Sequence, residues 1–283
     1  MHNDVKCYIC KYQAVLYRKG NIKEFSPQDL KITDSQYGKH WDLYKCPNCK
    51  LTFSFPLPDQ KLLIKFYSEM KDSEYTEEES GRKRNFLKIL KTLEKFSPSK
   101  GSLLDIGAAS GMLVQLATQR SWDAEGIEPN IDLFQKSLQK NITMYNSDLE
   151  SFTPKRSYDA ITAIDIIEHL YNPELLIFKA SNWLKKTGIL CIVTPNIGSF
   201  MAKIFKKKWW HLRPPHLFYF NKDSINFLLK KYNFKIIACK SYVWHFSLHY
   251  LLSRLNLKFD NKLLKSVIIP LYLFDSLEIY AQK

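Results

Sequence analysis

The sequence predicts an α/β protein with a doubly wound sheet, preceded by a small cysteine-rich unit. Three observations carry this prediction. Apolar runs of strand length alternate with helical patterns after residue 101, a small-residue turn joins the first of these strands to a helix, and two Cys-x-x-Cys pairs lie within the first 50 residues. Such alternation is typical of parallel strands joined by crossover helices. The 283 residues suffice for one large domain and a small appendage.

The expected elements follow in chain order. Apolar residues spaced by three and four predict helices over 62–70 and 82–96. The polar, acidic stretch 71–81 reads as a linker, so the predicted domains are 1–58, a helical linker 59–84, and 85–283. Beyond it, strands are expected at 102–106, 122–127, 142–145, 158–164 and 189–194, and helices at 111–119, 131–139 and 173–184, the last begun by Asn172 and Pro173.

Four of the six cysteines form two pairs of equal spacing, Cys7-x-x-Cys10 and Cys46-x-x-Cys49. Two intervening residues let both thiolates of a tight turn face one tetrahedral Zn²⁺. The pairs therefore predict a zinc ribbon with structural metal, whose hairpins fall within 22–44. Disulfides or a redox pair are the alternatives, disfavoured by the lack of an export signal and by the doubled motif. Cys191 and Cys239 lie singly in apolar runs and are expected to be buried strand residues.

Basic residues are concentrated in one part of the chain. The formal net charge is +14, and residues 201–240 hold ten Lys and Arg against one acidic residue, whereas 101–200 are slightly acidic. A local cluster favours an acceptor that carries phosphate over a nucleic acid held along an evenly basic surface. No uncharged run approaches the ~20 residues of a spanning helix, and the first residues lack an apolar leader. A cytoplasmic location is expected, with peripheral membrane contact left open.

The turn after the first strand of the alternating region carries the clearest functional signal. The segment Leu103-Leu-Asp-Ile-Gly-Ala-Ala-Ser-Gly111 leads an apolar strand through small residues into a helix. Such a turn lets the backbone approach a ligand and aims free helical N–H groups at it. Glu128 ends the next strand, where an acid suits a ribose diol, and Asp148, after the third, can bind an exocyclic amine. This order predicts a site for a nucleoside-bearing cofactor.

These motifs resemble those of class I S-adenosylmethionine-dependent methyltransferases, in the subgroup near the ubiquinone-type enzymes. The resemblance implies a Rossmann-like, seven-stranded sheet whose last strand, expected over 271–281, is antiparallel. Ala109 departs from the family pattern, which has glycine there, and we expect cofactor binding to survive. A nicotinamide-binding domain would need that glycine and is disfavoured. The resemblance covers about 85–283 and rests on Asp105 to Gly111, Gly126 to Pro129, Ser147-Asp148, Tyr158 to Leu170, Leu184 to Asn196 and His216 to Phe220.

The resemblance also implies which residues hold S-adenosylmethionine. The glycine turn would take its methionine part, the acid after the second strand its ribose, and the acid after the third its adenine. An acid after the fourth strand would border the active-site mouth. In this chain the implied residues are Asp105, Gly107, Ala109 and Gly111 of the turn, followed by Glu128, Asp148 and Asp165.

Two histidines are candidates for acceptor chemistry. His169 follows Asp165-x-x-Glu168 and has the near-neutral unperturbed pKa of a general base, with packing or capping as its alternative role. In some relatives acids of this motif bind a divalent ion, but one acid and one histidine make an incomplete set. His216 lies in a proline-stiffened loop. His245 and His249 are four apart on what reads as an aromatic lid or packing helix. Residues expected to face the substrate are Lys206, Lys207, Lys208, Trp210, His211, Arg213 and Tyr219, the lysines having a solvated helix face as their alternative.

Three functions are left open by the sequence. The first is a methyltransferase acting on a small or carrier-bound acceptor, such as a phosphate-bearing sugar of surface-glycan biosynthesis. The second is an RNA methyltransferase that grips phosphates with the ribbon and the lysine cluster. The third is a non-catalytic protein that keeps the fold, against which the retained Asp105, Gly107, Glu128 and Asp148 argue.

Overall fold

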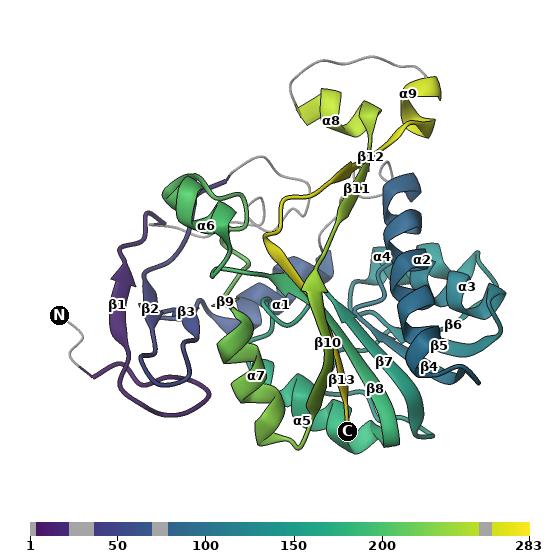
Figure 1. Ribbon diagram of the computed structural model, residues 1–283, viewed down its shortest axis with the longest axis horizontal. Helices are drawn as coiled ribbons and strands as arrows, with labels where there is room; N and C mark the ends of the chain where they lie inside the picture. Colours follow the sequence, from purple (N-terminus) through teal and green to yellow (C-terminus); the bar gives the residue numbers. More distant parts are fainter. Residues whose placement is uncertain (1–3, 23–36, 70–78, 255–261) are drawn as a thin grey trace.

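The computed structural model describes residues 4–22, 37–69, 79–254 and 262–283. Its centre is a seven-stranded sheet with the strand order β10-β13-β8-β7-β4-β5-β6 (Figure 1). Strands β4 to β8 run parallel, and β13, the last strand, is antiparallel between β8 and β10. The predicted fold class is confirmed. The strands are β4 Gly101–Ile106, β5 Trp122–Ile127, β6 Thr143–Tyr145, β7 Tyr158–Ile164, β8 Leu184–Pro195, β10 Lys235–Ser241 and β13 Ser276–Gln282.

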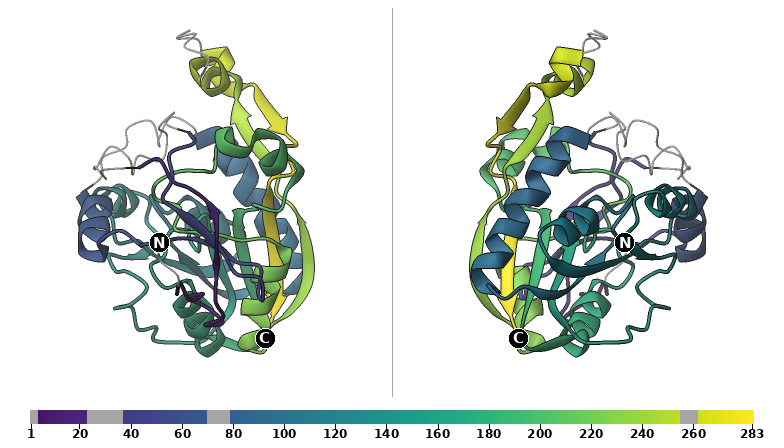
Figure 2. Two further views of the ribbon diagram at one scale, coloured as in Figure 1. Left: turned by 90° about the vertical axis from the view of Figure 1, so that its left-hand side faces the viewer. Right: turned by 90° about the vertical axis from the view of Figure 1, so that its right-hand side faces the viewer.

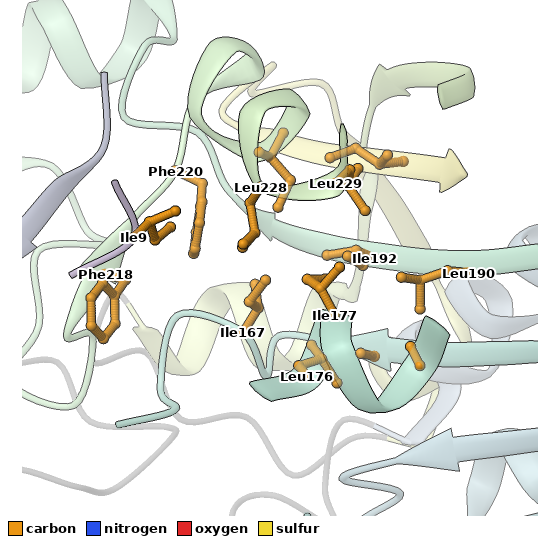
Figure 3. Close-up of a cluster of buried hydrophobic side chains, with 14 of the residues drawn as sticks. Ile9, Ile167, Leu176, Ile177, Leu190, Ile192, Phe218, Phe220, Leu228 and Leu229 are labelled. Carbon is orange, nitrogen blue, oxygen red and sulfur yellow. The ribbon is translucent and has the colours of Figure 1, made fainter. Parts of the chain in front are cut away.

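Helices cover both faces of this sheet. Side chains of β8 alternate between two buried clusters, because successive residues of a strand point to opposite faces. Leu190 and Ile192 face the cluster of α5 and α7, where Figure 3 shows them beside Leu176 and Ile177. Cys191 faces the cluster of α2 and α3. The helices are α2 Glu79–Phe96, α3 Met112–Gln119, α4 Ile131–Leu138, α5 Pro173–Trp183 and α7 Lys222–Lys231.

The C-terminal part contains an arm that the sequence did not predict. Two strands and two short helices between β10 and β13 project beyond the sheet (Figures 1 and 2). The closing strand therefore begins at Ser276 and not at residue 271, because the residues up to Leu271 pair with β11. The shared helix predicted for His245 and His249 is also wrong, since His245 is buried on β11 and His249 lies on α8. The arm consists of β11 Trp244–Ser247, α8 Leu248–Arg254, α9 Lys262–Ser266 and β12 Ile268–Leu271.

The two single cysteines differ in burial. Cys191 is fully buried in β8, as predicted. Cys239 is exposed, so the prediction that it is buried is wrong. Its strand, β10, is the edge of the sheet, and such a strand leaves part of its side chains in solvent despite an apolar sequence.

The N-terminal segment forms a second sheet with a strand from the other half of the chain. β1 (Val15–Arg18), β2 (Leu43–Lys45) and β3 (Thr52–Ser54) are antiparallel, and β3 pairs in turn with β9 (Phe218–Tyr219). Figure 3 shows Ile9 of this segment beside Phe218 and Phe220 in the main cluster. The predicted ribbon hairpins at 22–44 lie largely outside the described residues, as does the stretch 70–78 of the predicted linker 59–84.

Two further elements complete the fold. Helix α1 (Gln60–Glu69) matches the first predicted helix, and α6 (Phe200–Phe205) follows β8 near the N-terminal sheet (Figure 1). Domain boundaries at residues 58 and 84 stay a prediction. No helix in the described part of the chain has both the length and the apolar character needed to cross a membrane.

Candidate functional site

The turn between β4 and α3 requires glycine at two positions. Gly107 and Gly111 have φ angles of 72° and 75°, in the left-handed region that side chains rarely adopt. A Cβ on Gly107 would lie 2.1 Å from Ile166 Cδ1, and one on Gly111 would lie 2.3 Å from Ile142 Cδ1. The backbone is thus free of side chains at the carboxyl edge of the sheet, where ligands of doubly wound folds bind.

Ala109 also adopts a left-handed conformation, with φ 48°. Its backbone N–H donates to Glu128 Oε2 at 2.9 Å, which ties the turn to the end of β5. The residue replacing the family glycine therefore keeps the glycine-like backbone and bears a strain of about 1–2 kcal/mol.

Ala109→Gly should stabilise the protein, because glycine adopts this φ without the clash of a Cβ. We expect a gain of about 1 kcal/mol in the free energy of unfolding. Ala117→Gly in α3 should instead cost about 1 kcal/mol or more, since that alanine is buried in a helix. Denaturant unfolding of both variants tests this expectation, which a destabilised Ala109→Gly would contradict.

Three carboxyl groups end adjacent strands at this edge of the sheet, those of Asp105 and Glu128 buried and that of Asp165 half-buried. Burial raises the pKa values of Asp105, Glu128 and Asp165 to about 7 each. Glu128 is fully buried, and its Oε1 accepts from the N–H of Asn130 at 2.8 Å. Asp105 accepts from the Thr162 hydroxyl at 2.6 Å. Within the described residues none of the three carboxylates forms an ion pair, so a cationic ligand would stabilise all of them.

Asp148, the fourth predicted acid, lies after β6 at the same edge. Its Oδ1 accepts from the backbone N–H of Ser151 at 2.7 Å and from the Ser151 hydroxyl at 2.5 Å. The side chain is only partly buried. The carboxylate is therefore held in place by its own turn at the edge of the sheet.

A second cluster brings Glu168, His169 and His216 together, with their ligand atoms all within 4.8 Å of one another. The two imidazole rings meet edge to face, 4.7 Å between centroids. Glu168 Oε2 accepts from the Thr194 hydroxyl at 3.0 Å, whereas Glu168 Oε1 and His216 Nδ1 are buried without a hydrogen-bond partner among the described residues. His216 supplies the third group that the incomplete set in the sequence lacked, and three such donors can hold a divalent cation.

The electrostatics of this cluster keep both imidazoles neutral. Burial, and then the positive charge of Arg213, lower the pKa of His169 to about 4. Burial, and then the neighbouring His169, His211 and Arg213, hold the pKa of His216 well below its usual range. His169 Nδ1 lies 3.1 Å from the Pro215 carbonyl, which can only accept, so Nδ1 carries the proton and Nε2 presents a lone pair.

The loop before β9 and β9 itself carry the residues predicted to face a substrate, and the structure separates them into three groups by exposure. Lys206, Lys207 and Lys208 form a short 3-10 helix and are exposed. Tyr219 is buried, and its hydroxyl donates to the Arg213 carbonyl at 3.4 Å, so its side chain is a packing residue. Trp210, His211 and Arg213 are only partly buried along the loop.

His211 is linked to a buried carboxylate of the C-terminal segment. Its Nε2 lies 3.2 Å from Asp275 Oδ2, which also accepts from Trp209 Nε1 at 3.2 Å. The His211 ring stacks on His216, 6.1 Å between centroids. The loop is thereby fixed next to the histidine cluster.

Sequence reasoning missed the side chains that hold these acids. Thr162 and Thr194 bind Asp105 and Glu168, and the Tyr67 hydroxyl of α1 bonds to Glu128. Asp275 is fully buried beside the loop. The two threonines lie in apolar strands among core residues and belong to no recognisable sequence motif. Tyr67 and Asp275 reach the site only through the fold.

The four paired cysteines form one cluster with all sulfur atoms within 4.8 Å. The Sγ atoms of Cys7 and Cys49 are 3.5 Å apart, and those of Cys10 and Cys46 3.4 Å. A tetrahedral zinc with bonds of 2.3 Å separates its sulfurs by about 3.8 Å, whereas a disulfide requires about 2.05 Å. The donor set and its spacing therefore fit zinc and exclude disulfides.

Each cysteine pair lies on the same kind of turn. The N–H of Lys11 donates to the Cys7 carbonyl at 3.0 Å, and that of Lys50 to the Cys46 carbonyl at 3.1 Å. Both lysines have left-handed backbones, with φ 60° and 63°. Two matching turns of this kind are typical of the knuckles that hold zinc in a ribbon.

Comparison with known proteins identifies the family and the fold of this chain. A methyltransferase-domain family model matches residues 78–238. A ubiquinone biosynthesis O-methyltransferase from Pelagibacter ubique is 31% identical over 121 residues, 40% of this chain and 50% of that protein. A pavine N-methyltransferase from Thalictrum flavum is 30% identical over 100 residues, 32% of this chain and 28% of that one. The chain spans about half the length or less of these relatives.

Solved structures share the fold at low sequence identity. The magnesium protoporphyrin IX methyltransferase of Synechocystis, with bound S-adenosylhomocysteine, has a TM-score of 0.55 at 12% identity, over 80% of this chain and all of that one. A plantazolicin methyltransferase has a TM-score of 0.52 at 16% identity, over 78% and 93% of the chains. Because the family model spans more than half of the sequence, the chain belongs to the class I S-adenosylmethionine-dependent methyltransferase family, as its motifs predicted.

Proposed function

We propose that this chain transfers a methyl group from S-adenosylmethionine to a small or carrier-bound acceptor that bears phosphate. The observation that carries the proposal is that two clusters of side chains, the carboxyl groups and the histidine cluster, lie close together. Three carboxyl groups, buried or half-buried, and the turn of Gly107 lie at the carboxyl edge of the sheet, and the histidine cluster follows β7 at the same edge. One cluster suits a cationic cofactor and the other an acceptor group.

The cofactor side rests on charge and shape. S-adenosylmethionine supplies an electrophilic methyl group on a sulfonium, and it also carries an ammonium and two ribose hydroxyls. The bare backbone at Gly107 and Gly111 would take the methionine part, with Asp165 bordering it. Glu128 would accept from the ribose hydroxyls and Asp148 from the adenine amine. Carboxylates that are shielded from water and lack a cationic partner are stabilised in their ionised form when such a cation binds beside them.

Cofactor binding should strengthen as the pH rises through 7. The pKa values of Asp105, Glu128 and Asp165 are raised to about 7 by burial, so protonation below that pH removes the charge that attracts a cation. Between pH 6 and pH 7.5 we expect about an eightfold gain in affinity for each carboxyl that must ionise. Calorimetric titration across this range tests it, and an affinity independent of pH would contradict it.

The acceptor side rests on the histidines. A neutral imidazole with a free Nε2 lone pair can accept the proton of an acceptor hydroxyl and align its oxygen. A pKa of about 4 makes His169 a weak base, however. The cluster with Glu168 and His216 can also hold a divalent cation. Dialysis against a chelator separates the two roles under conditions where metal analysis shows that the cysteine cluster keeps its zinc, because activity is then lost only in the second role.

The phosphate preference rests on the lysines. Lys206, Lys207 and Lys208 are exposed just before the loop that carries His211 and His216. Their charge suits a diphosphate or a lipid-linked phosphate. The sugar acceptor of surface-glycan synthesis remains one member of this class. RNA is the second candidate, supported by the same lysines, and it requires binding that weakens steeply with salt.

The test is transfer of labelled methyl from S-adenosylmethionine to nucleotide sugars, cell extract and total RNA. Transfer to a phosphate-bearing small molecule supports the proposal, whereas label in RNA alone supports the second candidate. Binding of the cofactor with no transfer to any fraction favours the non-catalytic alternative.

His169→Ala should lower turnover about 10²- to 10⁴-fold, the usual contribution of a group that assists proton removal. His249→Ala, on α8 of the arm, is the matched control and should leave turnover unchanged. Methyl transfer by both variants is compared at saturating cofactor. Unchanged turnover in His169→Ala would remove this residue from the acceptor site.

A further inference from the structure

We propose that the cysteine-bearing segment, residues 4–22 and 37–58, positions the histidine cluster, and that Trp41 is a positioning residue for His169. The inference rests on the proposed function and deepens it. The segment contains no member of either cluster of the site. Its hydrogen bonds nevertheless end on the backbone of the loop 211–217, which contains His216 and whose Pro215 carbonyl contacts His169.

The first contacts run through the two prolines of that loop. Trp41 Nε1 donates to the Pro214 carbonyl at 3.1 Å, and the N–H of Gly38 donates to the Leu212 carbonyl at 2.9 Å. The next carbonyl, of Pro215, faces His169 Nδ1 at 3.1 Å. Only the φ and ψ of Pro215 separate these two carbonyls, and the proline ring fixes φ, so the hydrogen bond of Trp41 restricts the carbonyl that orients the His169 ring.

The second contacts run through β3, which begins three residues after Cys49. Ser54 N–H donates to the Leu217 carbonyl at 2.8 Å, and the Ser54 hydroxyl donates to the His216 carbonyl at 3.4 Å. Phe53 pairs with Phe218 of β9. Tyr8, between the cysteines of the first knuckle, packs its ring on both phenylalanines at 5.1 and 5.5 Å. The knuckles thus border the strand that follows His216.

The opposite side of the same loop is held by the turn that carries the cluster. The N–H groups of Leu217 and Phe218 both donate to the Glu168 carbonyl, at 2.8 and 3.1 Å. The loop is therefore fixed between the cysteine-bearing segment and the turn after β7. A displacement on the first side changes the ring positions of His169 and His216, on which alignment of an acceptor depends.

The consequence is a separation between the two halves of the reaction. The residues proposed to bind the cofactor are held by hydrogen bonds to α1, β4 and β5, whereas the indole N–H of Trp41 donates to the loop beside the histidines. Loss of the Trp41 hydrogen bond should therefore reduce turnover and leave cofactor affinity unchanged.

The test compares Trp41→Phe with Trp183→Phe in the full-length, zinc-loaded chain. Phenylalanine keeps a ring and removes the N–H. Trp183 ends α5, a crossover helix that returns to the opposite edge of the sheet, and its ring packs on Phe152. We expect Trp41→Phe to lower kcat about 10- to 100-fold, with zinc content and the Kd of S-adenosylmethionine unchanged, and Trp183→Phe to match the wild type.

Nitrogen-15 NMR of the histidine rings supplies a readout that needs no acceptor. Trp41→Phe should shift the His169 Nδ1–H resonance, and Trp183→Phe should not. This shift tests the positioning role even if no methyl transfer is found, so failure of the proposed function would be recognised separately. Should Trp41→Phe not fold, Ser54→Ala, which removes only a hydroxyl, repeats the test at His216. Wild-type spectra and turnover in the folded variants would overturn the proposal.

Discussion

Glu128→Gln should weaken the binding of S-adenosylmethionine about 10- to 100-fold. Both carboxylate oxygens accept from backbone N–H groups, of Ala109 and Asn130, and an amide offers only one acceptor. Hydrogen bonds to a charged group contribute about 1.5–3 kcal/mol, which corresponds to this loss. The turn would also move, since one buried N–H would face the new amide hydrogens. Calorimetric titration at pH 7.5 measures the effect.

Asp132→Asn is the matched control for this substitution. Asp132 lies four residues along the chain and pairs with Lys136 on the surface of α4, so the same charge is removed nearby without touching the turn. The control should bind the cofactor like the wild type. Equal affinities for Glu128→Gln and the wild type would remove Glu128 from the cofactor site.

Cys46→Ser should abolish stoichiometric zinc binding and nearly all methyl transfer. Structural zinc contributes about 10–16 kcal/mol in small zinc modules, which is as large as the whole stability of a typical domain. Cys46 is fully buried, and the knuckle that it begins leads directly into β3. We therefore expect the cysteine-bearing segment to unfold and to release the loop of His216.

Cys239→Ser is the control, because that thiol is exposed on β10 and lies outside the cysteine cluster. Metal analysis, proteolysis and cofactor titration distinguish the expected result from general unfolding. Cys46→Ser should be cut within the segment and lack zinc, yet keep its affinity for S-adenosylmethionine within a few-fold. Full activity without zinc would contradict both the zinc site and its connection to the acceptor side.

The parts of the fold that follow local pattern could be predicted from the sequence. The limits of β5 and β7 agree residue by residue with the predicted strands, and β7, which is covered on both faces, is apolar except for Asp159 and Thr162. The edge strand β10 has a similar signal and yet exposes Cys239. The difference lies in the neighbours of each strand, which only the assembled sheet determines.

The candidate site divides in the same way. The acids at strand ends, such as Glu128, could be located because the order of elements fixes the edge where they meet. The third member of the histidine cluster, His216, is separated from Glu168 by 48 positions and joins it through backbone bonds of a loop. Tyr219 is of a residue type that often contacts substrates, but it is buried beside β3, a strand near the other end of the chain.

The pairing of β3 with β9 also bears on how the chain is made. Phe53 leaves the ribosome before its partner Phe218, which lies 165 positions further along the chain. At the usual rates of about 5–20 residues per second, a ribosome needs roughly 10 to 30 seconds to synthesise that interval. During this time the emerging zinc knuckles can fold while the outer edge of β3 remains without its partner strand. A nascent chain with an open, apolar strand edge is a natural client for chaperones.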